Sequence, residues 1–273
     1  MTKKTRGKEY YDNKKEELKK KLDQVLTKTL VSKEEMDKLA SHYRITGLYN
    51  YSFYNTITIM VQGGTIAQSF HGWKKLKRSV KKGVHSKISI YRPFFKKVKD
   101  EKTGEEKQKL VGFGLSPVFD IEQTEGEDLK YDHNSQDNID CSYEGMKAAA
   151  VSEWKLEVVE AVTGKARGFT DGKKITISSM SNNTDKVKTL IHEIAHCRME
   201  HVGNSKTSGA KEVEAEGAAY LAMSYVGIDY ALSEAYINGW KSKDTNVDRK
   251  LIIKVADEII KKLFSRKEIK KAA

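Results

Sequence analysis

Apolar residues recur at helical spacing along much of the N-terminal part of the chain. Residues 9–30 place leucines and a tyrosine three or four positions apart among Lys and Glu, which predicts an amphipathic helix. Ser32 followed by Glu35 predicts a capping box that starts a second helix. Two further apolar-rich segments, 51–62 and 70–80, also favour helices. We therefore expect the chain to begin with helices.

Shorter alternating runs predict strands between and after these helices. Residues 86–91 alternate up to Pro93, and residues 111–121 form a second such segment. A hairpin over residues 168–178 is expected to turn at Asp171-Gly172. Further helices are expected over residues 143–162, 184–202, 209–226, 230–240 and 246–264. The mixture predicts an α+β fold class.

One polar segment divides the chain. Residues 122–140 are acidic and contain almost nothing that a core could bury, which is typical of a linker. We therefore expect a basic N-terminal domain over residues 1–122, an acidic linker over 123–141 and a mostly helical domain over 142–273. A length of 273 residues with 38% hydrophobic residues is enough to give both domains a core.

Composition excludes several classes of protein. The first residues contain no apolar stretch that could serve as a signal sequence, and nowhere do 18 apolar residues run together. Cys141 and Cys197 are too few and too far apart for a disulfide framework or an all-cysteine zinc site. We therefore expect a cytoplasmic protein without a membrane partner, in which His and carboxylate side chains hold any metal.

The positive charge is concentrated in one part of the chain. Residues 38–99 contain 13 Lys or Arg and no Asp or Glu, whereas residues 100–144 contain 13 acidic and four basic residues. An all-cation stretch repels itself unless a polyanion screens it, which favours a nucleic-acid surface. The alternative is a solvated lysine-rich face, although such faces usually mix both signs.

Aromatic residues are interleaved with these cations, which is the mixture that single-stranded nucleic acids require. Phe70, Phe94 and Phe95 fit a stacking role and a core role equally well, and Trp73 is expected to be packed on at least one side. The residues from this stretch that we expect to contact single-stranded DNA are Trp73, Lys74, Lys75, Arg78, Lys81, Lys82 and Lys87.

Residues 192–196 read HEIAH, an H-E-x-x-H motif inside a predicted helix. At about 100° per residue, His192 and His196 lie on one face, where both imidazoles can bind one Zn²⁺ ion. Glu193 stands beside them and can act as a general base on a metal-bound water. The pattern predicts a zinc site in which Glu193 is catalytic and is not a ligand.

The third ligand is expected from the next helix, where residues 212–216 read EVEAE. Glu212 and Glu216 share a face and Glu214 points roughly the opposite way, so one of the pair can bind metal while the other orients a ligating histidine. His201 is the competing third ligand. It is disfavoured because a continued helix places it about 140° from His196, with no glycine between them to turn the chain.

The order of these elements favours a peptidase. A preceding edge strand, the motif helix and an E-x-x-x-E helix are the arrangement of a minimal zincin, in which a substrate strand pairs with the edge and lies across the metal. The protein substrate is not identifiable from the sequence. Tyr220 and Tyr225 are candidates for a second oxyanion donor by residue type alone.

Residues 45–126 closely resemble the N-terminal domain of ArdC-type antirestriction proteins of plasmids, conjugative elements and phages. The shared features are Tyr51-Ser52 with Asn55, Gln62, Gly72-Trp73, Arg78 with Val80-Lys81-Lys82-Gly83, and Phe119-Asp120 with Gln123-Thr124.

The resemblance implies an N-terminal domain that binds single-stranded DNA, with Tyr51 and Asn55 added to its contact residues. It also implies a zincin-like C-terminal domain, and it favours Glu212 as the ligand, with Glu216 in the surrounding shell. The implied function is antirestriction or DNA protection for a phage or mobile element. The alternative is a non-catalytic DNA-binding protection protein whose zinc site is structural or vestigial.

Overall fold

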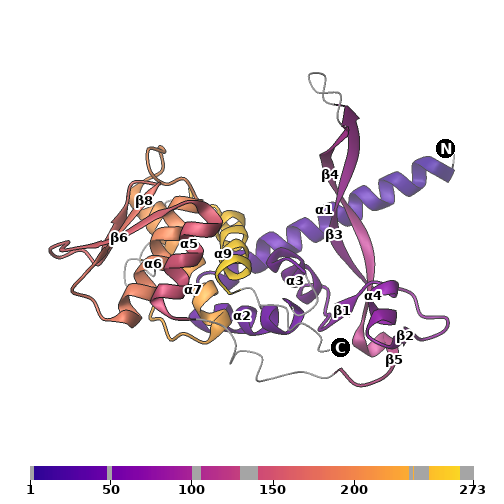
Figure 1. The fold of residues 1–273 in the computed structure, drawn as a ribbon. Coiled ribbons are helices and arrows are strands. Elements are labelled where there is room, and N and C mark those ends of the chain that lie inside the picture. Colours follow the sequence, from indigo (N-terminus) through magenta and orange to yellow (C-terminus); the bar gives the residue numbers. More distant parts are fainter. Residues whose placement is uncertain are drawn as a thin grey trace. The chain divides into compact units, whose positions relative to one another are not determined.

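The computed structural model describes residues 3–47, 51–99, 106–129, 141–233, 236 and 246–264. The chain divides into two compact units (Figure 1): unit 1 comprises Met1–Val25 and Ile45–Lys130, and unit 2 comprises Leu26–Arg44 and Tyr131–Ala273. Both helices and strands occur in each unit, which confirms the predicted α+β class.

Unit 1 contains short helices and two small sheets. Its elements are the first part of α1 (Lys3–Thr29), α3 (Phe53–Met60), β1 (Ala67–Gln68), α4 (Phe70–Lys75), β2 (Arg78–Val80), β3 (Ile88–Lys99), β4 (Glu106–Asp120), the 3-10 helix η1 (Ile121–Gln123) and β5 (Thr124–Gly126). Strand β4 lies between β1 and β3 in an antiparallel sheet, and β2 pairs with β5. Strand β5 thus lies inside the segment expected to be a linker, because it completes a sheet of unit 1.

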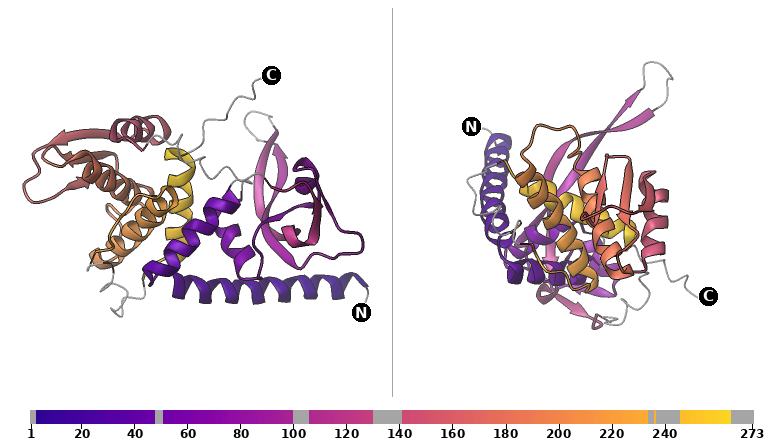
Figure 2. Two further views of the ribbon diagram at one scale, coloured as in Figure 1. Left: turned by 90° about the horizontal axis from the view of Figure 1, so that it is seen from below. Right: turned by 90° about the vertical axis from the view of Figure 1, so that its left-hand side faces the viewer.

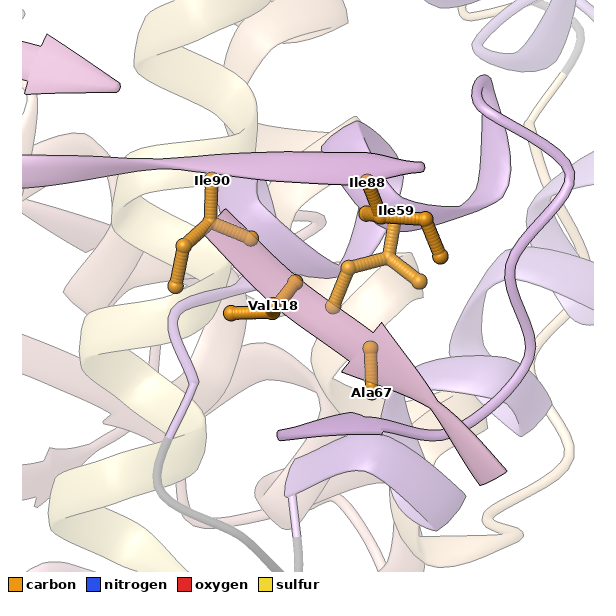
Figure 3. Packing of buried hydrophobic residues seen from close by; sticks show 5 residues of the cluster. All are labelled: Ile59, Ala67, Ile88, Ile90 and Val118. Carbon is orange, nitrogen blue, oxygen red and sulfur yellow. The ribbon is translucent and has the colours of Figure 1, made fainter. Parts of the chain in front are cut away.

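A small hydrophobic cluster holds unit 1 together (Figure 3). Ile59 of α3 packs with Ile88 and Ile90 of β3, Val118 of β4 and Ala67 of β1. All five side chains are buried, so the helix and the inner halves of the strands form one core.

The outer halves of β3 and β4 form a two-stranded ribbon that extends away from the rest of unit 1 (Figures 1 and 2). Their register runs from Ile88 opposite Val118 to Lys99 opposite Glu106. The strand therefore continues past Pro93, where the sequence predicted an end. It can do so because β3 is an edge strand of the described sheet, where a missing backbone N–H is tolerated.

Unit 2 is mostly helical with a three-stranded sheet. Its elements are α2 (Lys33–Gly47, of which residues 33–44 fall in this unit), α5 (Tyr143–Trp154), β6 (Glu157–Ala161), β7 (Gly168–Thr170), β8 (Lys174–Ser178), α6 (Asn183–Arg198), α7 (Ser208–Val226) and α9 (Arg249–Leu263). Strand β8 lies between β6, with which it is parallel, and β7, with which it is antiparallel. Helix α7 packs against both α6 and α9.

Residues 26–44 belong to unit 2, although the sequence-based division places them in the N-terminal domain. Leu30 and Met36 are fully buried, and the backbone carbonyl of Leu30 accepts a hydrogen bond from the Tyr236 hydroxyl. Arg44 donates to the carbonyl oxygen of Ser224 at 2.9 Å. Burial and these long-range bonds attach the segment to the helices of unit 2.

Two helix predictions differ from the structure. The helix expected over 143–162 ends at Trp154, where Lys155 adopts a left-handed conformation, and β6 follows. Burial of Leu156 and Val158 and pairing with β8 outweigh the helical pattern there. The helix expected over 70–80 ends at Lys75, and β2 follows. The helix expected over 230–240 lies largely outside the described residues.

Candidate metal centre

Helix α6 holds the H-E-x-x-H motif in a fixed position. The side chain of Asn182 caps its N-terminus by accepting a hydrogen bond from the backbone N–H of Asp185 at 2.9 Å. One face of the helix buries Val187, Leu190, Ile191 and Ile194. His192 and His196 lie one turn apart, and both line a cleft.

Three side chains from α6 and α7 bring their ligand atoms together. The Nε2 atoms of His192 and His196 lie 3.0 Å apart; that of His192 lies 3.3 Å from Glu212 Oε2, and that of His196 lies 3.3 Å from Glu212 Oε1. Ligand atoms about 2.1 Å from a tetrahedral divalent ion stand about 3.4 Å apart. The three residues therefore fit a divalent cation with little movement, and no other His, Cys, Asp or Glu cluster of this kind occurs among the residues that the structure describes.

The electrostatics of the cluster favour an ionised carboxylate. Hydrogen bonds from His192 and His196 hold the pKa of the Glu212 carboxyl well below its ordinary value. Glu212 can therefore supply a charged oxygen ligand over a wide pH range.

Glu193 lines the same cleft but is not part of the ligand cluster. Its side chain is buried, and burial raises the pKa of the carboxyl, although the neighbouring His192 and His196 oppose this effect. A carboxylate with a raised pKa beside a metal site is suited to accept a proton from water. The geometry is thus compatible with the role that the motif predicts for Glu193.

A buried pair of residues supports His196 from the side opposite the cluster. The Nδ1 atoms of His196 and His201 lie 3.0 Å apart, and His201 Nε2 lies 2.9 Å from an oxygen of Glu214. If His196 Nε2 binds a cation, its proton is on Nδ1 and is donated to His201. The proton of His201 is then on Nε2 and is donated to Glu214. Each donor in this chain therefore has an acceptor.

Glu214 is completely buried, and its carboxylate accepts hydrogen bonds from three donors. Besides His201, it accepts hydrogen bonds from Lys206 Nζ and from the backbone N–H of Asp248, each at 2.5 Å. Burial opposes ionisation of this carboxyl, but these three hydrogen bonds outweigh it and lower its pKa. The sequence did not assign a role to Glu214.

The position of His201 depends on an unexpected turn. Helix α6 ends at Arg198, and Glu200 adopts a left-handed conformation with φ of 54°, although it is not a glycine. The backbone N–H of His201 then donates to the carbonyl oxygen of His196 at 3.1 Å. His201 lies outside the ligand cluster, as expected, but because the chain turns rather than because the helix continues.

Among the described residues, Glu216 forms no hydrogen bond or ion pair with a histidine. It accepts hydrogen bonds from the backbone N–H and the hydroxyl of Ser233 instead. His201 and Glu214, rather than Glu216, lie behind His196 in the described structure. The Nδ1 atom of His192 is buried and has no hydrogen-bond partner among the described residues.

Neither tyrosine named as an oxyanion donor lines the cleft. The hydroxyl of Tyr220 is buried and donates to Asp37 at 2.6 Å, and the ring of Tyr225 packs against Tyr43. Tyr230 lines the cleft instead, and burial raises the pKa of its hydroxyl. Only the tertiary structure distinguishes these three tyrosines.

The cleft has a volume of about 520 Å³ and is bordered by strand β7. This strand lies close to α6 because Gly168 has no side chain: a Cβ atom there would lie 2.6 Å from Thr189 Cγ2. Arg167 and Asp171 form backbone hydrogen bonds toward β8. By antiparallel alternation, the backbone N–H and C=O groups of Gly168 and Thr170 therefore point to the open edge of the described sheet.

In unit 1, several predicted DNA contacts have structural roles. Trp73 is fully buried, and its Nε1 donates to the carbonyl oxygen of Phe119 at 2.8 Å. The guanidinium of Arg78 is buried and donates to oxygens of Thr124, Gly126 and Glu127. Trp73 has no exposed surface for a base, and Arg78 has little for a phosphate because its donors are already bonded within unit 1, which corrects their predicted role.

Asn55 and Tyr51 also serve the fold. The Asn55 amide bonds to the backbone N–H and C=O of Tyr91, each at 2.9 Å. Tyr51 packs against the core of unit 1, and burial raises the pKa of its hydroxyl to about 12. Five of the predicted contacts are exposed: Lys74, Lys75, Lys81, Lys82 and Lys87.

Comparison with known proteins identifies this part of the chain. Residues 8–119 match the family model for the N-terminal domain of anti-restriction factor ArdC. Residues 8–119 therefore resemble an ArdC-type N-terminal domain. The resemblance predicted from the sequence is thereby confirmed. No curated protein matches the chain significantly.

Two crystal structures of the antirestriction ArdC protein from the R388 plasmid are similar to the chain. The metal-free structure is 20% identical, with a TM-score of 0.42, and the match covers 76% of this chain and 81% of ArdC. The Mn(II)-bound structure is 17% identical, with a TM-score of 0.38, and the match covers 82% and 92%. The family match ends at residue 119, so the metal centre of this chain lies outside it.

The ArdC-type domain exposes aromatic rings that the sequence left ambiguous or missed. Phe94, Phe95 and Phe113 of the ribbon are each more than half exposed, at 53%, 55% and 51%. The ring of Phe94 lies over Gly114, where a Cβ atom would be only 2.1 Å from it. The only sequence signal for Phe113 was its place in a glycine-flanked strand.

Among the described residues, no helix is long and apolar enough to cross a membrane.

Proposed function

We propose that the protein is a zinc-dependent peptidase whose ArdC-type domain binds single-stranded DNA, and that it serves antirestriction for a phage or mobile element. The observation that carries the peptidase part is the convergence of His192, His196 and Glu212 beside the buried Glu193. Two imidazoles and one carboxylate are a ligand set that Zn²⁺ accepts while leaving a coordination position open.

The residues of the cleft have separate roles in this proposal. The outward backbone groups of Gly168 and Thr170 bind an extended peptide as an added strand, which positions its carbonyl group near the ligand cluster. Glu193 accepts a proton from the attacking water and transfers it to the leaving amine. The zinc ion supplies Lewis acidity. Tyr230 lines the cleft and carries a hydroxyl group that can donate a hydrogen bond, so we assign to it the stabilisation of the oxyanion.

For DNA, the proposal combines the exposed lysines with the ribbon. Lys96 and Lys109 lie directly opposite each other across the ribbon, and both are exposed. Like charges in such a pair repel each other unless an anion lies between them. Phe95 and Phe113 expose aromatic surface elsewhere on the same ribbon. Phosphates on the lysines and bases on the rings are the usual elements of single-strand binding.

The test is a cleavage assay on the full-length, zinc-loaded protein. Proteins that associate with single-stranded DNA are incubated with it in the presence and absence of an oligonucleotide. We expect cleavage of some candidates, stimulated by DNA, and none with Glu193→Gln. If zinc binds stoichiometrically and no candidate is cleaved, the non-catalytic alternative replaces the peptidase.

A further inference from the structure

Three cationic side chains line the cleft from three different elements. Arg167 precedes β7, Lys188 lies on α6 one turn before His192, and Lys211 precedes Glu212 on α7. The carboxylates in the lining are Glu193 and Glu212. A bound divalent cation would offset these two negative charges and leave the three cations unbalanced.

The amino-acid composition of this part of the chain does not explain why cations outnumber carboxylates in the cleft. Residues 131–230 contain 15 Asp or Glu and 11 Lys or Arg, so a surface drawn evenly from them would be slightly acidic. The cleft has the opposite balance. A concave site with one sign of charge concentrates ligands of the other sign.

Many cations elsewhere in unit 2 form ion pairs with carboxylates, and the three cations of the cleft differ from them in this respect. Six cations elsewhere lie within 3.1 Å of a carboxylate oxygen: Lys174, Lys186, Arg198, Lys206, Lys261 and Lys262. Within the described part of the chain, Arg167 and Lys188 form no such ion pair, and Lys211 Nζ donates to the carbonyl oxygen of Asn204 at 3.0 Å. Lys186 and Lys188 are two residues apart on α6, and of these two only Lys186 forms an ion pair with a carboxylate of the described residues.

We propose that the cleft selects peptides with Asp or Glu side chains next to the scissile bond, which Arg167 and Lys188 bind. This inference rests on the proposed peptidase function. A peptide is favoured over a nucleic acid because the outward N–H and C=O groups of Gly168 and Thr170 match the backbone of an extended peptide. Nucleic acids have no such repeating donor and acceptor pairs.

The test uses full-length, zinc-loaded protein and a set of internally quenched peptides. The peptides share one scaffold and carry Glu, Gln or Lys on either side of each candidate bond. We expect the Glu peptides to have the highest kcat/KM. Arg167→Glu and Lys188→Glu should each reduce kcat/KM for the Glu peptide by about tenfold or more and improve cleavage of the Lys peptide, because like charges at a contact are strongly unfavourable.

Lys254→Glu is the matched control. It makes the same change of net charge at an exposed position of α9 that does not line the cleft, and we expect the wild-type preference. Cleavage of all peptides with equal kcat/KM would overturn the charge preference and leave the peptidase intact. No cleavage of any peptide or protein would instead overturn the proposed function. Binding of a fluorescent oligonucleotide that Lys188→Glu abolishes would place nucleic acid in the cleft and also overturn the inference.

Discussion

The Nδ1 atom of His201 lies 3.0 Å from the Nδ1 atom of His196, the second histidine of the H-E-x-x-H motif. His201 also contacts the fully buried Glu214, so a carboxylate and an imidazole fix the ring of a proposed metal ligand from behind. Such support sets both the orientation and the tautomer of a ligating histidine.

Replacement of His201 should therefore weaken metal binding. His201→Phe fills a similar volume but accepts no proton from His196, and we expect zinc affinity to fall about 10- to 100-fold. His201→Gln, whose amide can accept from His196 and donate to Glu214, should restore part of the affinity. Competition with a chromophoric chelator measures the affinity, and the spectrum of the Co²⁺-substituted protein reports the ligand geometry. Unchanged affinity and spectrum in His201→Phe would remove the positioning role.

Glu214 and Glu216 provide a direct comparison. Glu214→Gln should weaken zinc binding because it removes the charge that His201 faces. Glu216→Gln should leave the affinity close to that of the wild type, because its carboxylate bonds to Ser233. The reverse ranking in the chelator assay would restore the orienting role that the sequence favoured for Glu216.

Measurement of bound zinc should distinguish a metal ligand from the general base. His196→Ala is expected to lose stoichiometric zinc, because it removes one of three protein ligands. Glu193→Gln is expected to keep zinc and to lose peptidase activity, because Glu193 lies outside the ligand cluster. Elemental analysis of both variants after dialysis checks this, and equal zinc loss would show that the roles are assigned wrongly.

Aromatic residues of the ribbon should contribute to DNA affinity. Phe95→Ala and Phe113→Ala are each expected to weaken binding of a poly(dT) oligonucleotide by about 1–3 kcal/mol, because each removes a stacking surface. Phe169→Ala, an equally exposed aromatic in unit 2, is the control and should bind normally. Fluorescence anisotropy measures the affinities.

Trp73→Ala should instead reduce the free energy of unfolding by about 3–5 kcal/mol, since that ring is buried.

Salt dependence should distinguish exposed from buried cations. Reversal of Lys81 and Lys82 to Glu should weaken single-strand binding and reduce the slope of log affinity against log salt by about 0.7 for each phosphate that the lysines no longer neutralise. Arg78→Glu should destabilise unit 1, because the guanidinium bonds to Thr124 and neighbouring backbone. Circular dichroism separates the two outcomes, and a folded Arg78→Glu variant with normal affinity would contradict the structural role.

Acid should destabilise the contact between α2 and α7. Partial burial of Asp37 tends to raise its pKa, but hydrogen bonds from Tyr220, Lys33 and Ser224 outweigh it and lower the pKa. The bonds contribute stability above the pKa of an unfolded Asp, about 3.9, and the contribution disappears as pH falls through the lower folded value. Asp37→Asn should therefore be less stable at pH 7 and lose less stability on acidification. Thermal denaturation from pH 7 to pH 3 checks this.

The sequence by itself determined the local features of this protein. The spacing of His192 and His196 is set by the helical repeat, so their convergence on one face beside Glu193 could be predicted from five residues. Apolar periodicity likewise predicted α3, α6 and α7 with small errors at their ends, because burial of one helical face is a local pattern. The resemblance of residues 8–119 to the ArdC N-terminal domain was also present in the sequence motifs.

Tertiary structure decided what depends on contacts between distant residues. Strand β6 exists because it pairs with β8, which outweighs a helical pattern in the sequence. Trp73 and Arg78 look like DNA contacts by composition, yet they are buried against residues more than 40 positions away. Phe95 and Phe113 are exposed because the ribbon extends beyond the core. His201 reaches His196 only because Glu200 adopts a left-handed backbone conformation. A glutamate does not favour this conformation, so the sequence gives no sign of the turn.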